Sequence, residues 1–258
     1  MNLDTSAPVL LLGGKENSLS VTRHLGRLGI TVRVCGPASC WGLYSRHCAE
    51  AFPVPAGEKQ VPFWARLLLG NDTRLNGHIV LALSDDAIEF LAANRASLAS
   101  RYRLDDSDAA LAKTFLDKLA TLEMAKAAGV GAPNFWKIDV GCDLEDLRGK
   151  IVFPAIVKPL QSHQFSKIFR QKLFVIDNDF DELKAKVELA RQHGVEVFIA
   201  EMIPGPDSQL SSYYTYRLAD GRKLFHFTKS IIRRWPVNRG NACYHRTGRY
   251  PETQAAGE

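Results

Sequence analysis

The stretch Phe153-Pro154-Ala155-Ile156-Val157-Lys158-Pro159 places a lysine at the end of an apolar run that begins at Ile151. We predict a buried strand over 151–157, because a short apolar run bounded by turn signals is typical of such strands. Pro159 lacks a backbone N–H and is expected to prevent the strand from continuing as a central ladder. Lys158 therefore presents a fixed cation at the mouth of the strand, and phosphate is its expected partner.

Two further stretches accompany this one in a fixed order. Upstream, Phe115-Leu116-Asp117-Lys118 lies inside a predicted amphipathic helix that runs to Ala128, where a lone lysine usually faces solvent. Downstream, a predicted strand over 195–200 leads into Glu201-Met202-Ile203-Pro204-Gly205-Pro206-Asp207. A strand that leaves a sheet at a proline offers an apolar slot and backbone groups that suit an adenine edge. The Asp207 carboxylate suits ribose hydroxyls, so the order predicts an ATP site built from two lobes.

The segment 160–172, directly after the first stretch, is polar and basic and includes Lys167. We predict a mobile loop there, followed by a strand over 173–176 and a helix over 179–193. A loop between two strands can close over a triphosphate, and a plain exposed hairpin loop is the alternative interpretation.

The last fifty residues begin with two strand-like runs, over 211–218 and 223–232. Ala219-Asp220-Gly221-Arg222 lies between them, and an Asp-Gly pair in this position is a strong hairpin signal. We therefore predict the start of a second lobe here. The polar residues 247–258 are predicted to be a frayed end.

The first hundred residues alternate between strand and helix signals, which predicts a doubly wound α/β domain. Ser18 or Ser20 is the expected cap of the first helix, Gly29 its end, and Asp85 the expected cap of the last helix. The strands are predicted over 8–12, 30–35 and 78–83, and the helices from the Ser18 or Ser20 cap to Leu28, over 62–69, and from Asp85 to about Ala99.

Composition excludes several classes of protein. The chain has 258 residues, 46% hydrophobic and 24% charged, which is enough for about two domains with buried cores. A net charge of +5 invites a nucleic-acid interpretation, but the basic residues are dispersed, and a polyphosphate site explains the cluster around Arg233-Arg234 equally well. No run is apolar enough to cross a bilayer, and the five cysteines lack C-x-x-C spacing. We expect a cytoplasmic protein that binds neither nucleic acid nor membrane.

These residues resemble the ATP-grasp superfamily, in particular its carboxylate–amine ligase and carbamoyl-phosphate-synthase-like branch. The motifs around Lys118, Lys158 and Glu201 look like the three ATP-binding signatures in their usual order. The likeness implies a Rossmann-like pre-ATP-grasp domain followed by a partial α+β ATP-grasp domain. The implied boundaries are 1–108 for the first domain, 109–205 for the ATP-binding lobe and 206–258 for the start of a C-terminal lobe.

The resemblance also implies roles for single residues. Lys118 and Lys158 would bind the ATP phosphates, and Lys167 in the lid segment is a further candidate for this role. Glu201 and the backbone of Met202 and Ile203 would contact the adenine. Asp207 would contact the ribose. Candidates for binding the transferred phosphoryl group or the substrate carboxylate are Lys229 and the proposed catalytic residues Arg233, Arg234 and Arg239. A solvated basic strand face is the alternative for these four.

In this family ATP phosphorylates a carboxylate, and an amine attacks the acyl phosphate, with magnesium offsetting the charge. The expected partners are thus a small-molecule carboxylate and an amine, and a homodimer is left open. Two departures from the family pattern stand out: residues 159–172 contain no glycine, and no late strand carries a carboxylate. We assign no metal ligand within the chain and expect the magnesium ligands beyond residue 258. A non-catalytic nucleotide-binding or regulatory remnant, and an unrelated α/β binding domain, remain alternatives.

Overall fold

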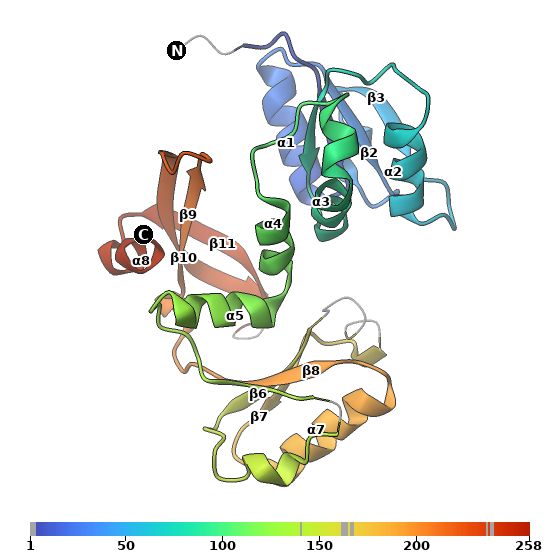
Figure 1. Cartoon of the computed structure of the whole chain (residues 1–258). Helices are drawn as coiled ribbons and strands as arrows, with labels where there is room; N and C mark the ends of the chain where they lie inside the picture. Colours follow the sequence, from blue (N-terminus) through green and yellow to red (C-terminus); the bar gives the residue numbers. More distant parts are fainter. Residues whose placement is uncertain (1–3, 140, 161–164, 166–167, 236, 238–239) are drawn as a thin grey trace. The chain divides into compact units, whose positions relative to one another are not determined.

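The computed structural model describes residues 4–139, 141–160, 165, 168–235, 237 and 240–258 (Figure 1). It divides into two compact units, 1–116 and 117–258, each with its own buried apolar core. Among the described residues, no helix combines the length and the apolar character that a membrane crossing requires.

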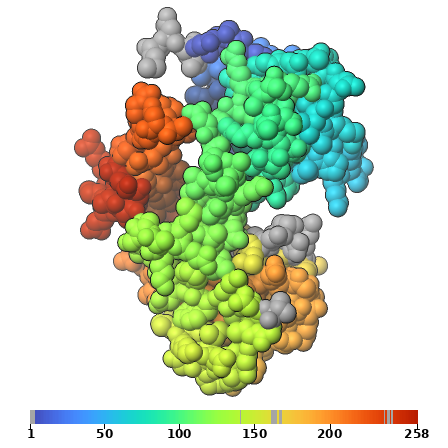
Figure 2. All heavy atoms as spheres, viewed as in Figure 1, coloured from blue at the N-terminus to red at the C-terminus, as the bar shows by residue number. Residues whose placement is uncertain are grey.

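Unit 1 is built on a parallel sheet with the strand order β3–β2–β1–β4. Its central strand β1 (Val9–Leu12) is buried along its whole length, as expected for a strand covered on both faces. Side chains fill the space between the ribbons of this unit (Figure 2). The remaining elements are β2 (Val32–Gly36), η1 (Trp41–Tyr44), β3 (Cys48–Pro53), β4 (Ile79–Ala82), α1 (Glu16–Arg27), α2 (Gln60–Leu69), α3 (Asp85–Ala99) and α4 (Ala109–Leu116).

This arrangement confirms the predicted α/β class of the first part of the chain. The edge strand β3 was not predicted, because its side chains alternate between exposed and half-buried and include no long apolar run. Gly29 follows α1 with φ of +83°, as expected of a glycine that ends a helix.

The predicted helix caps in unit 1 were wrong. Helix α1 begins before Ser18, whose buried hydroxyl instead donates to the Lys15 carbonyl at 2.5 Å and accepts from the Gly42 N–H at 2.9 Å. At α3 the cap is Ser84, whose Oγ accepts from the Ala87 N–H, so the cap lies one residue before the predicted one.

Unit 2 contains an antiparallel sheet with the strand order β5–β8–β6–β7. Helix α7 (Phe180–Gln192) packs on one face of this sheet and helix α5 (Lys118–Ala127) on the other. The strands are β5 (Phe135–Lys137), β6 (Ala155–Pro159), β7 (Phe174–Ile176) and β8 (Val197–Glu201).

Strand β6 differs from its prediction in extent and in the role of its proline. It begins four residues later than expected and includes Pro159, which pairs with Val197 of β8. Pairing with β7 has already ended at Val157, so the absent N–H of Pro159 costs no ladder hydrogen bond on that side.

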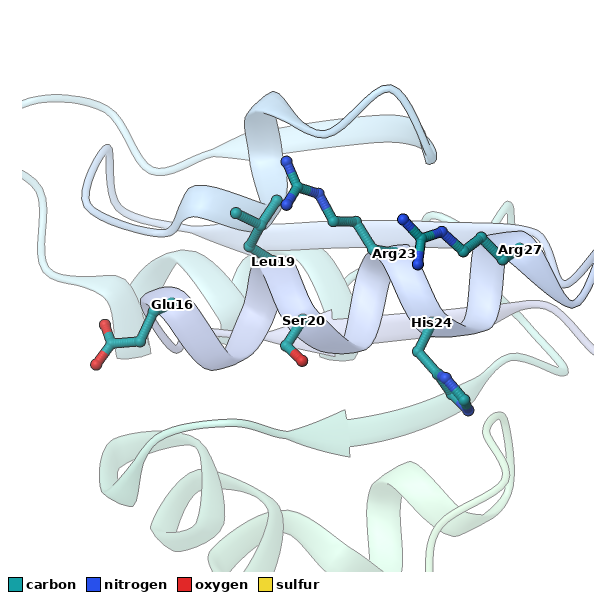
Figure 3. A pocket seen from close by; sticks show the side chains of 6 residues that line it. All are labelled: Glu16, Leu19, Ser20, Arg23, His24 and Arg27. Carbon is teal, nitrogen blue, oxygen red and sulfur yellow. The ribbon is translucent and has the colours of Figure 1, made fainter. Parts of the chain in front are cut away.

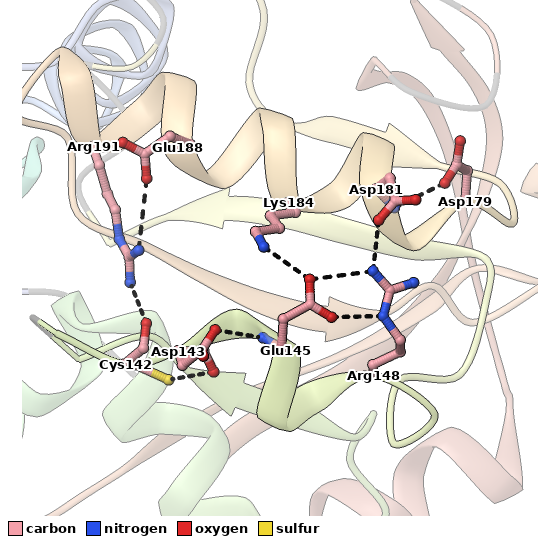
Figure 4. A network of polar contacts seen from close by, with 9 residues as sticks. All are labelled: Cys142, Asp143, Glu145, Arg148, Asp179, Asp181, Lys184, Glu188 and Arg191. Atoms are coloured by element: carbon pink, nitrogen blue, oxygen red, sulfur yellow. Dashed lines mark hydrogen bonds and ion pairs between the residues drawn. The ribbon is translucent and has the colours of Figure 1, made fainter.

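A network of charged side chains connects η2 (Leu144–Leu147) to α7 (Figure 4). The Glu145 carboxylate accepts from Arg148 at 2.7 Å and from Lys184 at 2.8 Å, and Arg148 also donates to Asp181 at 2.6 Å. The hydrogen bonds from Arg148 and Lys184 lower the pKa of Glu145 to about 2. Because these groups are exposed, the network orients η2 more than it stabilises the fold.

The described part of the segment 160–172, for which we predicted a mobile loop, contains helical residues. Phe165, Ile168 and Phe169 are helical, and the Phe165 ring is fully buried. It packs 4.6 Å from the Phe169 ring and 4.9 Å from the Phe174 ring, measured between centroids. Aromatic burial therefore outweighs the polar composition of the segment. Lys167 lies outside the described residues.

A second antiparallel sheet of unit 2 has the order β9–β10–β11. Gly221, with φ of +83°, and the Leu218 N–H to Arg222 carbonyl bond close the predicted hairpin. The predicted frayed end was wrong, because Ser230 and Tyr250 share a 2.7 Å hydrogen bond that holds the last residues on this sheet. The elements are η3 (Asp207–Gln209), β9 (Ser211–Arg217), β10 (Lys223–Trp235), β11 (Asn241–Gly248) and α8 (Pro251–Gly257).

Phe165→Ala should lower the free energy of unfolding of unit 2 by about 3–5 kcal/mol, because it leaves a cavity among Phe169 and Phe174. Urea denaturation followed by hydrogen exchange of the β7 amides measures this change. Ile168→Ala is the matched control: its side chain is 42% exposed, so its cost should be below about 1 kcal/mol. Equal effects of the two variants would contradict the burial described here.

Candidate functional site

The register between β6 and β8 decides which side chains of unit 2 share a face of the sheet. Lys158 lies opposite Phe198, and Ala155 lies opposite Glu201. Directly opposed residues project from the same face, and successive residues from opposite faces. Lys158 therefore belongs to the face on which α5 packs, with Phe198, whereas the Glu201 side chain belongs to the α7 face.

Lys118 reaches this face because helix α5 begins at this residue. The amphipathic helix that we predicted to run to Ala128 is interrupted at Asp117, which has extended backbone angles and caps α5. The Asp117 carboxylate accepts from the Leu119 N–H at 2.8 Å and the Ala120 N–H at 3.1 Å. An aspartate cap competes with continuation of the helix, so Lys118 becomes the first residue of α5 instead of an interior one.

Lys118 and Lys158 form a pair of neighbouring cations. Burial of the half-buried Lys158 lowers the pKa of its amine, and the charge of Lys118 lowers it further. Neither lysine has an ion pair or hydrogen bond with a described side chain. Two like charges held together are unfavourable without an anion, so this part of the sheet is suited to a phosphate or another polyanion.

The residues that end β8 are already engaged in hydrogen bonds. The Glu201 carboxylate accepts from the Asn134 side-chain amide at 3.0 Å and from its backbone N–H at 3.2 Å. The Met202 N–H donates to the Pro154 carbonyl at 2.9 Å. The Ile203 side chain is 61% exposed. A ligand on the α5 face would therefore meet backbone at this strand end, and not the Glu201 carboxylate.

The structure brings two predicted site residues into contact with each other. Asp207, at the start of η3, accepts from the Arg234 Nε at 2.7 Å and forms a second contact with its terminal nitrogen. Both side chains are mostly buried, which favours a well-ordered pair. The pair joins η3 to β10. The Asp207 carboxylate, which we expected to bind ribose hydroxyls, is thus already bonded to Arg234.

The other basic candidates have different surroundings. The Lys229 Nζ lies 4.6 Å from the centre of the Tyr214 ring, which stacks on Phe227 with centroids 4.9 Å apart. Arg233 is exposed, on a part of β10 where the pairing register with β11 shifts. Arg239 lies outside the described residues. Within the described part of the chain, no three His, Cys, Asp or Glu side chains gather as metal ligands.

Sequence reasoning missed Asn134, which orients the Glu201 carboxylate, and no motif points to it. It also missed the cap function of Asp117, although an aspartate directly before a helical run is a recognisable start signal. The pairing of Asp207 with Arg234 joins residues from different elements, and no local pattern indicates such a contact.

Comparisons with known proteins support a fold assignment. A scan against protein-family models and a search of curated proteins gave no match. Among solved structures, the chain is similar to N5-carboxyaminoimidazole synthetase from Staphylococcus aureus complexed with ADP, with a TM-score of 0.65, 16% identity and 91% of this chain covered. It is also similar to L-amino acid ligase from Bacillus licheniformis, with a TM-score of 0.61, 16% identity and 96% covered.

A third similar structure is carboxyaminoimidazole ribonucleotide synthase from Aspergillus clavatus complexed with ATP, with a TM-score of 0.64, 14% identity and 90% of this chain covered. The chain spans only 57%, 57% and 56% of the length of these three proteins. The fold that the sequence resemblance implied is thus confirmed for this part of the chain's structural neighbours. A parallel α/β sheet followed by antiparallel sheets gives this chain the fold of part of these synthetases and ligases.

Proposed function

We propose that unit 2 binds ATP, and that the chain is the ATP-binding portion of a carboxylate–amine ligase. The observation that carries this proposal is the cation pair of Lys118 and Lys158, which has no acidic partner among the described residues. A triphosphate supplies the negative charge that this pair requires. The fold similarity to proteins solved with ADP or ATP supports the same ligand.

In this proposal Lys118 and Lys158 bind the phosphates, and the backbone at Met202 and Ile203 lies along the adenine edge. Because the Met202 N–H already donates to Pro154, hydrogen bonds to adenine come from the other backbone groups of 202–203. Phe198 is fully buried under α5, so apolar surface for the ring comes from the half-buried Ile156 and Leu160 at the edge of this cluster.

The Asp207–Arg234 contact changes two of the proposed roles. Arg234 orients Asp207, and Asp207 approaches a ribose only as part of this pair. The proposed contacts with the transferred phosphoryl group or the substrate carboxylate then belong to Lys229, Arg233 and Arg239. Lys167 remains a proposed phosphate contact from the segment after β6.

The proposed reaction has two steps. A carboxylate oxygen attacks the γ-phosphorus of ATP, the bond to the β–γ bridging oxygen breaks, and ADP leaves. The amine nitrogen then attacks the acyl carbon, phosphate departs, and the nitrogen loses a proton to give an amide. The lysines contribute position and electrostatic stabilisation of the phosphates and transfer no proton in either step.

The described residues do not fit a magnesium site. Strands β9, β10 and β11 carry no carboxylate, and the described part of the chain has no group of three potential ligands. We therefore assign no step to a metal. The same observation favours a second candidate function, in which the chain binds the nucleotide without catalysing ligation.

Lys158→Ala should weaken ATP binding about tenfold to a hundredfold, because it removes a charge-assisted hydrogen bond to phosphate. Lys118→Ala should have a similar effect, and isothermal titration calorimetry measures both. Lys126→Ala is the matched control, since this lysine lies exposed at the other end of the same helix. Unchanged affinity in Lys158→Ala, or an equal loss in Lys126→Ala, would refute the nucleotide site.

Lys158→Met should raise the free energy of unfolding of unit 2 in the absence of ATP. Burial and Lys118 lower the pKa of Lys158 in the folded protein, so its charged form is less favourable there than in the unfolded chain. This cost is full below the folded-state pKa and disappears as the pH rises through the unfolded-state pKa. Thermal unfolding at neutral and alkaline pH should show the advantage of the variant narrowing, and a constant difference would contradict this electrostatic origin.

This chain alone should bind ATP but release little or no ADP with magnesium present, because its described residues provide no group of metal ligands. A coupled ADP assay with pairs of amino acids measures the turnover, and binding is measured separately on the same sample. Robust magnesium-dependent ADP release that Lys158→Ala abolishes would favour the complete ligase over the non-catalytic alternative.

A further inference from the structure

Three arginines and a histidine of unit 1 line one open pocket. The pocket has a volume of about 380 Å³ and is lined by Arg23, Arg27, Arg46 and His47. Arg23 and Arg27 project from the same side of α1, one turn apart (Figure 3). A volume of this size lies within the range of small-molecule sites.

The wall that carries Arg46 is fixed to α1 by buried polar contacts. The Ser18 hydroxyl of α1 accepts from the Gly42 N–H of η1 at 2.9 Å, and the Thr22 hydroxyl donates to the Ser18 carbonyl at 2.7 Å. Both Ser18 and Thr22 are fully buried. The Gly42 contact therefore fixes η1 against the first half of α1, and the turn that carries Arg46 follows directly after η1.

A glycine in α1 allows the close approach of this turn. A Cβ atom at Gly26 would lie 2.6 Å from the His47 Cβ and 2.9 Å from its ring. Glycine inside a helix is less stabilising than alanine, so α1 loses some stability at Gly26, the position where His47 packs. The contact brings Arg46, next to His47, to the same pocket as Arg23 and Arg27.

The charges in this pocket are not balanced by the protein. Four other arginines of unit 1 pair with carboxylates: Arg33, Arg66, Arg74 and Arg95. Arg23, Arg27 and Arg46 have no ion pair with a described residue. Like charges one turn apart destabilise a helix. The helix dipole favours a cation at Arg27, the last residue of α1, but it does not explain Arg46, which lies off the helix.

The residues next to this pocket do not neutralise the positive charge of its three arginines. A second pocket of about 400 Å³ continues along α1, where Arg23 and Arg27 are joined by His24, Ser20 and Leu19. Its one acidic residue is Glu16, in the first turn of the helix and nearly two turns from Arg23. The positive charge therefore remains concentrated in the first pocket, which Arg46 lines together with Arg23 and Arg27.

We propose that Arg23, Arg27, Arg46 and His47 form a binding site for a compact phosphate-bearing small molecule. Guanidinium groups bind phosphate oxygens through paired hydrogen bonds, and three of them around one pocket match an anion with more than one negative charge. All four residues belong to unit 1, whereas the residues of the proposed ATP site belong to unit 2.

Inorganic pyrophosphate is the test ligand, titrated into the full chain with isotope-labelled arginine side chains at about 150 mM NaCl. The side-chain N–H resonances of Arg23, Arg27 and Arg46 should shift together and reach saturation. Arg46→Gln should weaken the affinity at least about tenfold, as expected for the loss of a charge-assisted hydrogen bond. Arg103→Gln, which changes an exposed arginine of the same unit, should leave the affinity within about twofold.

Two further variants separate binding from folding and from the ATP site. Gly26→Ala changes no charge but displaces His47, and it should also weaken pyrophosphate binding. Lys158→Ala should leave the arginine shifts unchanged, so failure of the ATP proposal does not affect this result. Without pyrophosphate, Arg23→Gln should leave the melting temperature unchanged or raise it, because it relieves repulsion with Arg27.

The absence of saturable arginine shifts up to about 10 mM pyrophosphate would overturn the proposal. An equal loss of affinity in Arg103→Gln would also overturn it, because the response would then reflect general positive charge. The unaltered chain could also fail to bind pyrophosphate while Arg23→Gln lowers the melting temperature. That result would overturn the proposal and show that the arginines serve only to stabilise α1.

Discussion

The antiparallel pairing of β6 with β8 determines the chemistry available to unit 2. A shift of this register by one residue would move Lys158 to the α7 face, into the apolar core around Val157 and Ile199. The register is held by that core, because its side chains project from one face of both strands. The position of the Lys158 amine on the α5 face thus depends on the packing of apolar side chains on the opposite, α7 face of the sheet.

The sequence predicted those parts of the fold that depend on local signals. The buried strand at 9–12, the glycine after α1 and the Asp220-Gly221 hairpin each have a short-range cause, and each lies where it was expected. Two errors concerned local signals, the helix caps at Ser84 and Asp117. Another arose where side chains from a distant element decide the outcome. Phe165 becomes helical and buried through contacts with Phe174, which composition alone does not indicate.

The candidate site was predictable to a similar degree. The order of the lysine motifs pointed to Lys118 and Lys158, and the structure places their charges close enough to interact. The partners of the remaining residues were not predictable. Asn134 engages Glu201, and Arg234 engages Asp207, through contacts between elements that lie well apart in the sequence. Local pattern identifies residue types suited to a ligand, whereas only the fold shows which of them another side chain already engages.

The position of Lys118 at the start of α5 has a consequence for the lifetime of the protein. The positive end of the helix dipole and the Lys118 charge, which also acts on Lys158, both lie at this helix start. The folded unit therefore carries an electrostatic cost that a bound anion relieves. An unfolded chain has no such convergence, and a ligand that binds only the folded form stabilises it by mass action. If the proposed ligand ATP binds there, the free energy of unfolding of unit 2 rises with the ATP concentration, and its resistance to proteases rises with it.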